Sequence, residues 1–340
     1  MLRPRRPRRA PLRLAAAVAA AVLATGCAGG GAGADGTTGA DGSGDPGSAS
    51  AGSGMPSGTS KSRGGDGGTA ADPGSDAGEL ADLAEKLAQG SDSEDVEARD
   101  GTVIGADISW PQCPRGMGIP EKRSQGMPMP LPRAEFVVVG LTNGPGFTAN
   151  PCLADQVDWV VAHRLLLSAY AVASYPDRAT LAEYGDQGPF DGAARLGRLR
   201  NVGYQQARFN IGSIGAAGLQ TPIVWIDVEP VPDFEWSGDA AANAAVVEGL
   251  ERGYTDAGYD VGVYSTPHLW AGVVGDLALG VPEWRAAGQT SAAEALSRCG
   301  EDWSIQGGEG ILGQWVEDRR DHNLTCPGTE SDLGRWFHQT

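Results

Sequence analysis

The sequence has no aromatic residue in its first third. All 22 aromatics, nine Trp, seven Tyr and six Phe, lie at or beyond Trp110 in a chain of 340 residues. Residues 28–79 contain 18 glycines instead, and such a composition buries little apolar surface and behaves as a flexible tether. We therefore predict a disordered Gly/Ser/Asp-rich linker over 28–101, with helical spacing of leucines at 79–88, and one folded unit over 102–340.

Lysine is also scarce, with three in the whole chain, and no acidic residue precedes Asp35. Six arginines fall within residues 1–13, so the rest of the chain carries 20 basic against 43 acidic residues, a net charge of −23. A chain this acidic repels phosphate backbones, which argues against nucleic acid as a partner. We expect a monomer.

No apolar run is long enough to cross a membrane. The run from Leu14 to Ala24 has eleven residues, whereas a spanning helix needs about 20, so it fits the core of a signal peptide. Thr25-Gly26-Cys27 resembles a bacterial lipobox. We predict that residues 1–27 are a lipoprotein signal peptide and that Cys27 is lipidated, which anchors the exported protein on the outer face of the cytoplasmic membrane, facing the cell wall. Ordinary secretory cleavage is the alternative, and the export route stays open.

Cysteines are few, and those of the folded part are even in number. Cys113, Cys152, Cys299 and Cys326 allow three pairings, and export favours disulfides. We predict Cys113–Cys152 and Cys299–Cys326. A zinc site is the alternative, but no C-x-x-C spacing occurs.

Apolar runs alternate with helical patterns from residue 103 onward. Short runs bounded by Gly, Pro or Asn predict buried parallel strands at 103–109, 135–142, 166–173, 222–228 and 260–264. Helical spacing predicts helices at 153–165 and 239–257. Repeated strand-then-helix units over about 240 residues favour an α/β fold, and a TIM-like (β/α) barrel suits this length.

Carboxylates follow two of these strands. Asp107 ends the first, and Asp227 and Glu229 end the fourth, two residues apart and therefore on one face. Two acids side by side in a partly buried site cannot both ionise cheaply, so one can serve as a general acid, as glycoside hydrolysis requires. A strand-end hydrogen bond or cap is the plainer interpretation. Asp233 and Glu235 repeat the spacing after two prolines and are expected on a solvated loop.

Motifs for other chemistries are missing. The sequence contains no H-E-x-x-H, G-x-S-x-G or G-x-x-x-x-G-K segment, and its four histidines are dispersed. We expect no metal and no organic cofactor.

Several strand-end motifs together resemble the family 25 glycoside hydrolases, lysozyme-like muramidases with an irregular α/β barrel, or a closely related actinobacterial lipoprotein. The likeness covers roughly residues 103–326 and runs in the family's order. Its pieces are Asp107-Ile-Ser-Trp-Pro-Gln112, Gly140-Leu-Thr-Asn-Gly144, Ser168-Ala-Tyr170, Ile226-Asp-Val-Glu229, Gly262-Val-Tyr-Ser265, Pro282-Glu-Trp284, Gly313-Gln-Trp315 and Asp321-His-Asn323.

The resemblance implies a role for each matching residue. Glu229 would be the general acid, and Asp227 would stabilise a positively charged intermediate formed by the substrate's own N-acetyl group. Asp107 and Asp321 would complete an acidic cleft floor. The expected sugar-binding residues are Trp110, Tyr170, Tyr264, Trp284 and Gln314, whereas Trp225 is expected in the core. The substrate would be peptidoglycan or another wall glycan.

Two departures from the family pattern affect one wall of the cleft. A Lys and a Glu of the family are replaced within 140–144, and the Met/Pro-rich segment 116–132 looks like an insertion. The chain could therefore be a non-catalytic glycan-binding lipoprotein, or an envelope scaffold with a fossil cleft. Convergence of the four acids on one site favours the enzyme.

Overall fold

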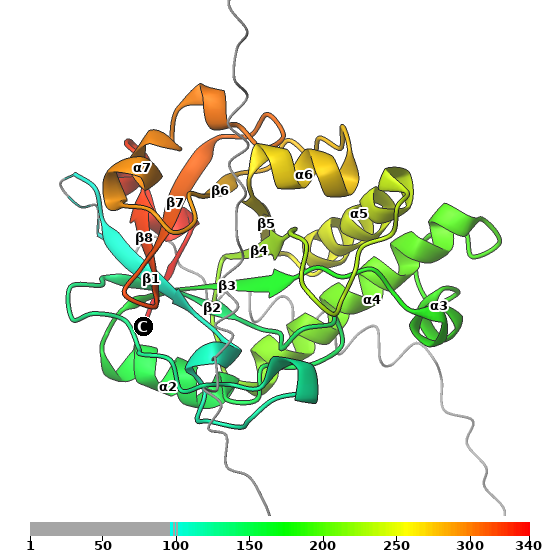
Figure 1. Cartoon of the computed structure of the whole chain (residues 1–340), viewed down its shortest axis with the longest axis horizontal. Helices are drawn as coiled ribbons and strands as arrows, with labels where there is room; N and C mark the ends of the chain where they lie inside the picture. The colour runs from blue at the N-terminus through cyan, green and yellow to red at the C-terminus, as the bar shows by residue number, and fades with distance from the viewer. Residues whose placement is uncertain (1–95, 98, 100) are drawn as a thin grey trace, which may run out of the picture. The chain divides into compact units, whose positions relative to one another are not determined.

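The structure, a computed structural model, describes residues 96, 97, 99 and 101–340 (Figure 1). The predicted signal peptide, Cys27 and the helix at 79–88 lie outside these residues. No helix in the described part combines the length and hydropathy needed to cross a bilayer.

Within residues 101–340, eight strands close into a barrel because β2 pairs with β3 at one end of the strand order β2-β1-β8-β7-β6-β5-β4-β3. A two-residue strand, β9, is added outside β3. The strands are β1 (Ile104–Ile108), β2 (Phe136–Gly140), β3 (Leu166–Val172), β4 (Ile223–Asp227), β5 (Asp260–Ser265), β6 (Glu283–Ala286), β7 (Gly310–Glu317), β8 (Arg320–Thr325) and β9 (His338–Gln339). The predicted α/β barrel and its first five strands are confirmed.

Helices connect most of the parallel strands and cover the outside of the barrel (Figure 1). They are α2 (Leu153–Ala162), α3 (Arg178–Tyr184), α4 (Arg195–Ala216), α5 (Ala240–Asp256), α6 (Pro267–Val274) and α7 (Ala292–Ser297), with 3-10 helices Trp110–Gln112, Pro120–Lys122, Glu301–Trp303, Thr329–Ser331 and Leu333–Arg335. Both predicted helices are present as α2 and α5. The second begins after Asp239, whose side chain caps the amides of Ala241 and Ala242.

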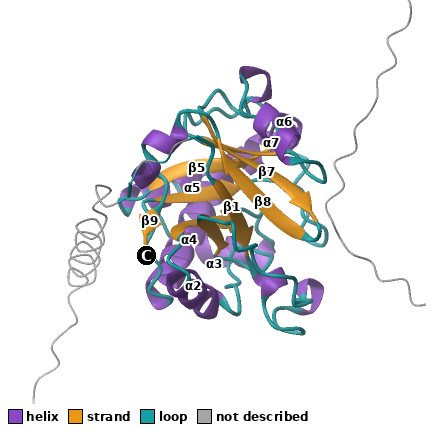
Figure 2. Cartoon of the chain, turned by 90° about the vertical axis from the view of Figure 1, so that its left-hand side faces the viewer, coloured by secondary structure: helices purple, strands orange, loops and turns teal. Residues whose placement is uncertain are grey.

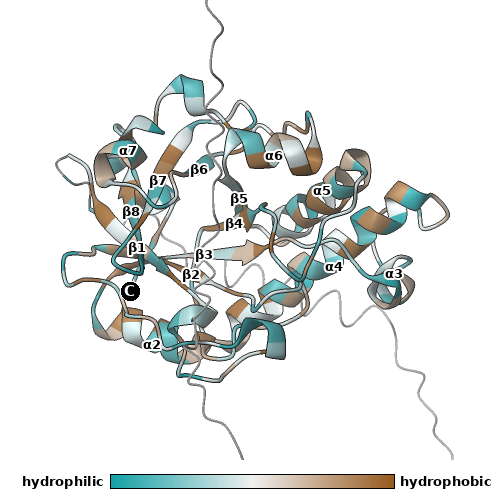
Figure 3. Ribbon diagram, in the orientation of Figure 1, coloured by the Kyte–Doolittle hydropathy of each residue, from teal (hydrophilic) through white to brown (hydrophobic). Residues whose placement is uncertain are grey.

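The longest helix, α4, was not predicted from the sequence. Its buried face carries polar and small residues as well as apolar ones, among them Asn201, Gln206 and Asn210. A Cβ atom at Gly203 would collide with the Val246 carbonyl of α5, and one at Gly249 with the Arg200 carbonyl of α4. The two helices thus pack backbone against backbone. Hydrophilic and hydrophobic colours alternate along both (Figure 3), as expected for helices with one buried face.

Strand β8 departs from the all-parallel prediction. Strands β1 to β7 pair in parallel, whereas β8 is antiparallel to both β7 and β1. The link between β7 and β8 is a tight turn in which Asp318 and Arg319 have φ of 51° and 59°, the backbone that a two-residue hairpin turn requires. Figure 2 shows β7 and β8 side by side at one edge of the barrel.

Aromatic side chains fill the barrel interior. Trp225 and Trp284 pack with Phe136, Trp336 and Phe337 in one cluster of buried residues, separate from the cluster between strands and helices. Trp225 is 0% exposed and donates its indole N–H to Ser168 Oγ at 3.1 Å, which confirms its predicted place in the core. Residues after β8 close the interior at the amino ends of the strands, where β9 pairs with Leu166 and Leu167.

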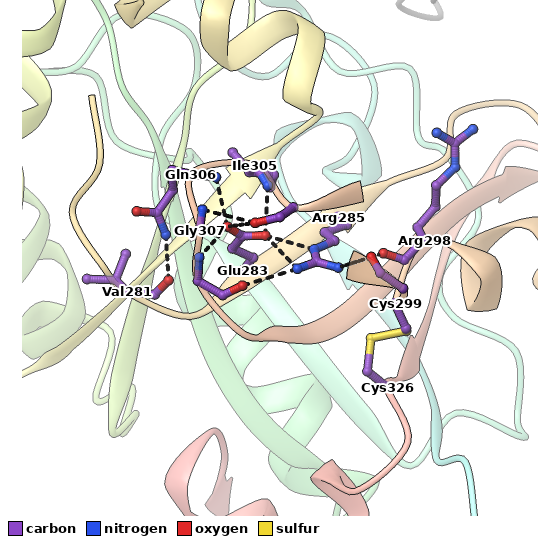
Figure 4. A network of polar contacts seen from close by, with 12 residues as sticks. Val281, Glu283, Arg285, Arg298, Cys299, Ile305, Gln306, Gly307 and Cys326 are labelled. Atoms are coloured by element: carbon purple, nitrogen blue, oxygen red, sulfur yellow. Dashed lines mark hydrogen bonds and ion pairs between the residues drawn. A yellow bond between two sulfur atoms is a disulfide. The ribbon is translucent and has the colours of Figure 1, made fainter. Parts of the chain in front are cut away.

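Both predicted disulfides are present, Cys113–Cys152 and Cys299–Cys326. The second lies beside a polar network on the outer side of β6 (Figure 4). There Glu283, which is 0% exposed, forms an ion pair at 2.8 Å with Arg285. Its carboxylate also accepts the backbone amides of Ile305, Gln306 and Gly308, each at 2.8 Å. Arg285 donates to the carbonyls of Arg298 and Gly300, so the network fixes the loop between α7 and β7.

Candidate active site

Four carboxyl groups gather at the mouth of the barrel. Asp107 of β1 pairs directly with Asp321 of β8, so their side chains lie next to each other on one face. Asp227 ends β4, and Glu229 follows two residues later. The structure thus brings together all four acids that the sequence singled out. Asp107 and Asp227 are 6% and 4% exposed, whereas Glu229 and Asp321 are half-buried at the rim.

These acids raise one another's pKa. Burial and then the charge of Asp107 raise the pKa of Glu229 to about 7, against a smaller lowering by Lys122. The pKa of Asp227 is raised well above its usual value by burial, then by Glu229 and Asp107. Burial, Asp107 and Glu229 act in the same direction on Asp321. The cluster therefore retains protons at neutral pH. Glu229, with a pKa of about 7, is protonated in part of the molecules at that pH.

Asp107 is the acid with the most hydrogen bonds. Its Oδ1 accepts from Gln314 Nε2 at 2.9 Å and from Asn323 Nδ2 at 2.7 Å. These bonds favour the ionised form, but burial outweighs them and the pKa of Asp107 rises to about 6. The side-chain amides of Gln314 and Asn323 are held in this orientation by bonds to their oxygens. Tyr264 Oη donates to Gln314 Oε1 and Trp284 Nε1 donates to Asn323 Oδ1, each at 2.7 Å.

Asp227 has the opposite surroundings. Its Oδ1 is buried and has no hydrogen-bond partner among the described residues. A buried acceptor without a donor is costly. This oxygen is consequently the atom of the cluster most in need of a donor from a bound molecule.

The aromatic residues divide into a buried support and a partly exposed surface. The Trp284 ring packs against Tyr264 and Tyr170, with centroids 4.5 and 5.6 Å apart. Tyr264 lies beside the whole cluster, since all four acids raise its pKa further above the value that burial imposes. Tyr170, Tyr264 and Trp110 are half-buried, so each can present part of its ring to a sugar.

Two of the predicted sugar-binding residues have other roles. Trp284 is 1% exposed, so its ring cannot stack on a sugar, and it supports Tyr170, Tyr264 and Asn323 instead. Gln314 is 6% exposed, and both ends of its amide bond to Asp107 and Tyr264. The burial of Trp284 therefore speaks against direct contact with a sugar, whereas contact of Gln314, which is as exposed as Asp107, stays a prediction.

The segment after β1 builds one wall beside the cluster. The Cys113–Cys152 disulfide ties its start to α2. Asn143, in the loop where the family has a Glu, is 0% exposed; its Oδ1 accepts from Ile119 N at 2.9 Å and its Nδ2 donates to Lys122 O at 3.0 Å. Arg320 of β8 donates to Met129 O at 3.0 Å. Asn143 thus anchors the segment after β1.

Sequence reasoning missed two residues of this site. Asn323 stands within the Asp321-His-Asn323 motif, and its spacing from Asp321 gave no reason to expect a bond to Asp107. Lys122 is the single lysine of residues 102–340, a rarity that was itself a signal. Asp233 and Glu235 are exposed on a loop, as predicted. No group of acids, histidines or cysteines in the described part is arranged to hold a metal ion.

The structure is a closed α/β barrel with four carboxyl groups at its mouth, none of them in an ion pair. Glycoside hydrolysis uses this architecture and a pair of such acids. The chain matches no protein-family profile.

Known proteins with local similarity are lysozymes. "Probable GH family 25 lysozyme 4" of Dictyostelium discoideum is 38% identical over 66 residues, which cover 19% of this chain and 30% of that protein. "Lysozyme-like protein 5" of Caenorhabditis elegans is 30% identical over 70 residues, 21% of this chain and 31% of that protein. The chain thus spans about a third of the length of these relatives. A family 25 glycosyl hydrolase from Bacillus anthracis aligns over 72% of this chain and 99% of its own, with 14% identity and a TM-score of 0.43. The resemblance to family 25 lysozymes is confirmed.

Proposed function

We propose that the protein hydrolyses the glycan strand of peptidoglycan, with Glu229 as the general acid. The observation that carries this proposal is the position of Glu229, which is half-buried at the rim beside Asp107, where burial and the charge of Asp107 raise its pKa to about 7. No ion pair to Glu229 exists among the described residues. A carboxyl that holds a proton near neutral pH is the group that protonation of a leaving oxygen requires.

The remaining acids fit roles around that proton. Glu229 would donate it to the glycosidic oxygen as the C–O bond breaks, and the substrate's acetamido oxygen would close on the anomeric carbon. Asp227 offers an oxygen without a partner, which would accept the acetamido N–H and stabilise the resulting cation. Water then opens the ring intermediate, and its proton returns to Glu229. Asp107 keeps the proton on Glu229 through its charge, and Asp321 lies beside Asp107 on the same face.

Sugar binding is assigned to the partly exposed aromatics. Tyr170 and Tyr264 lie beside the acids, and Trp110 begins the 3-10 helix that follows β1. Each is half-buried and can offer part of its apolar ring surface to a sugar. The local identity to proteins named as lysozymes supports a wall glycan as the substrate.

Product analysis tests the proposal. Purified full-length protein should release new reducing-end sugars from peptidoglycan, identified by mass spectrometry, and Glu229→Gln should not. Glu235→Gln, on the neighbouring exposed loop, is the matched control and should cleave like the wild type. Retention of the glycan without cleavage, equal in wild type and Glu229→Gln, would instead support the non-catalytic wall-binding protein.

We also propose that Cys27 is lipidated and holds the protein on the outer face of the cytoplasmic membrane. The support is the Leu14–Ala24 run followed by Thr25-Gly26-Cys27. In a bacterial host, the mature protein should partition with membranes and carry a lipid mass on its first residue. Cys27→Ala should move it to the soluble fraction, and an unchanged distribution would contradict the anchor.

A further inference from the structure

Glu229 lies just past the point where the sheet stops holding the chain. Strand β4 ends two residues earlier. Val228 is still fixed on both sides, since its N–H donates to Tyr264 O at 3.0 Å and its carbonyl accepts from Ser265 Oγ at 2.7 Å. Pro230 follows Glu229 and has no N–H to donate to a neighbouring strand. The backbone that carries the proposed acid therefore needs an anchor outside the sheet.

Trp236 supplies that anchor. Its indole N–H donates to the backbone carbonyl of Glu229 at 2.9 Å. Within residues 101–340 this is the one hydrogen bond that Glu229 makes, so its removal releases the backbone of the proposed acid. The Trp236 side chain is half-buried and packs against the cluster between strands and helices, which keeps the indole in place.

A tight turn brings Trp236 back to Glu229. Phe234 N donates to Val231 O at 3.1 Å, and Asp233, which lies between them, has a φ of 73°. A type II turn has this geometry and favours proline at its second position, as here. The loop from Glu229 to Trp236 is thus closed on itself by the indole bond at the acid.

This loop is held from two sides. The residue after Trp236 is fixed to α5, because Ser237 Oγ donates to Asn243 Oδ1 at 2.6 Å and Asn243 Nδ2 donates to Ser237 O at 3.0 Å. Asn243 is 1% exposed. On the other side, a Cβ atom at Gly144 would lie 3.0 Å from Phe234, so the Phe234 ring packs against the loop after β2. The indole N–H of Trp236 is therefore a fixed point.

We propose that Trp236 is a positioning residue for Glu229, and that its bond to the Glu229 carbonyl holds the acid among the other carboxyls, at the place from which it protonates the leaving oxygen. This inference rests on the proposed function. A reacting group that is misplaced by about 1 Å loses about 10²-fold in rate. A bond to the backbone of the acid therefore matters for the rate although Trp236 itself is assigned no contact with the substrate.

The test removes the indole N–H from the full-length protein. Trp236→Phe keeps an aromatic ring, and benzothienylalanine at position 236 keeps the two-ring shape with sulfur in place of the N–H. Each variant should lower kcat on soluble wall glycan strands by about 10- to 100-fold, with KM nearly unchanged. The alkaline limb of the pH profile should move to lower pH, because a Glu229 displaced from Asp107 loses its proton earlier.

A change of leaving group shows whether the loss lies in proton donation. A dinitrophenyl group departs without a proton, so Trp236→Phe should cleave a dinitrophenyl glycoside of the same N-acetylated sugar at nearly the wild-type rate. An equal loss on both substrates would overturn the inference, because it indicates general damage to the site. Unchanged kcat on glycan strands would contradict it as well.

Trp270→Phe is the matched control. The Trp270 indole also donates to a backbone carbonyl seven residues away, that of Leu277, at 2.8 Å, but it lies on α6 and has no assigned role at the acids. This variant should lose thermal stability and keep the wild-type kcat and pH profile. If the wild type cleaves no strand, the proposed function is rejected, and NMR of labelled carboxyl carbons decides the inference. The pKa of Glu229 should then fall in Trp236→Phe and not in Trp270→Phe, and an unchanged pKa in both would overturn the inference.

Discussion

Glu229 and Glu283 are acids of the same barrel with opposite surroundings. Glu283 is fully buried on the outer side of β6, where Arg285 and three backbone amides satisfy its carboxylate (Figure 4). Glu229 stands among three other acids at the mouth, and the pKa of its carboxyl rises to about 7. Burial of an acid therefore does not mark a catalytic site by itself. What sets the proposed general acid apart is that its neighbours are other acids and that it has no paired cation among the described residues.

The largest expected effect is on the chemistry at Glu229. Glu229→Gln removes the transferable proton and keeps the shape of the side chain, so hydrolysis should fall by about 10²–10⁴-fold or more. Release of reducing ends from wall glycan measures it, with Glu235→Gln as the exposed control. Thermal stability of Glu229→Gln should be at least that of the wild type, because a buried acid is replaced by a neutral amide. Retained hydrolysis would show that Glu229 is not the acid.

The second effect is on stability and not on activity, and it concerns Glu283. Glu283→Gln leaves Arg285 buried with a neutral partner, and breaking a buried ion pair in this way costs about 3–5 kcal/mol of unfolding free energy. Denaturant unfolding should show that loss, while activity per folded molecule stays close to the wild type. Glu301→Gln, exposed in the same loop, should change little. Equal stability of Glu283→Gln and wild type would remove the structural role assigned to this network.

A third effect depends on pH. The pKa of Asp227 is raised in the folded state by burial, Glu229 and Asp107, so its contribution to stability is fully present below the unfolded value near 4 and is lost as pH rises through the folded value. Asp227→Asn does not titrate and should stabilise the protein at pH 8 by at least about 1 kcal/mol relative to wild type, with less gain at pH 4. Asp233→Asn, on the exposed loop, should show no such pH dependence. A constant difference would contradict the raised pKa.

The smallest effect concerns the support of Asp107. Gln314→Met removes the donor at 2.9 Å, which raises the pKa of Asp107 further and weakens its charge beside Glu229. We expect about a tenfold fall in kcat, the size of one hydrogen bond to a charged group. The alkaline limb of the pH profile should shift toward lower pH, because a weaker charge on Asp107 lets Glu229 lose its proton earlier. Gln187→Met, exposed on the surface, is the control. An unchanged pH profile would show that Gln314 serves packing alone.

Much of the barrel could be predicted from local patterns, because buried parallel strands are short apolar runs and acids at their ends stand out. Asp227 and Glu229 were found in this way. The helix α4 escaped because its buried face relies on glycine and amide residues, which the hydrophobic period does not register. Trp284 was misjudged because a sequence motif does not tell which side of a ring faces solvent. Strand β8 was not predicted, because its sequence RDHNLT is largely polar and forms no apolar run.

The site was harder to predict wherever residues distant in sequence cooperate. Lys122 meets Phe234 and acts on Glu229 across more than a hundred residues, and no local pattern encodes such a meeting. Gln314 and Asn323 both reach Asp107 across more than two hundred. These contacts follow from closure of the barrel, which sequence spacing does not reveal.

The reversed strand β8 also determines at which end the chain enters and leaves the barrel. Because β8 runs against its neighbours, the chain leaves it at the amino ends of the other strands, where Leu333, Trp336 and Phe337 pack. Val96 and Val103 pack in the same cluster as the chain enters β1. Entry and exit thus share one pole, and the four acids occupy the other. Within the described residues, the segment that enters β1 and the one that leaves β8 therefore both lie away from the acids.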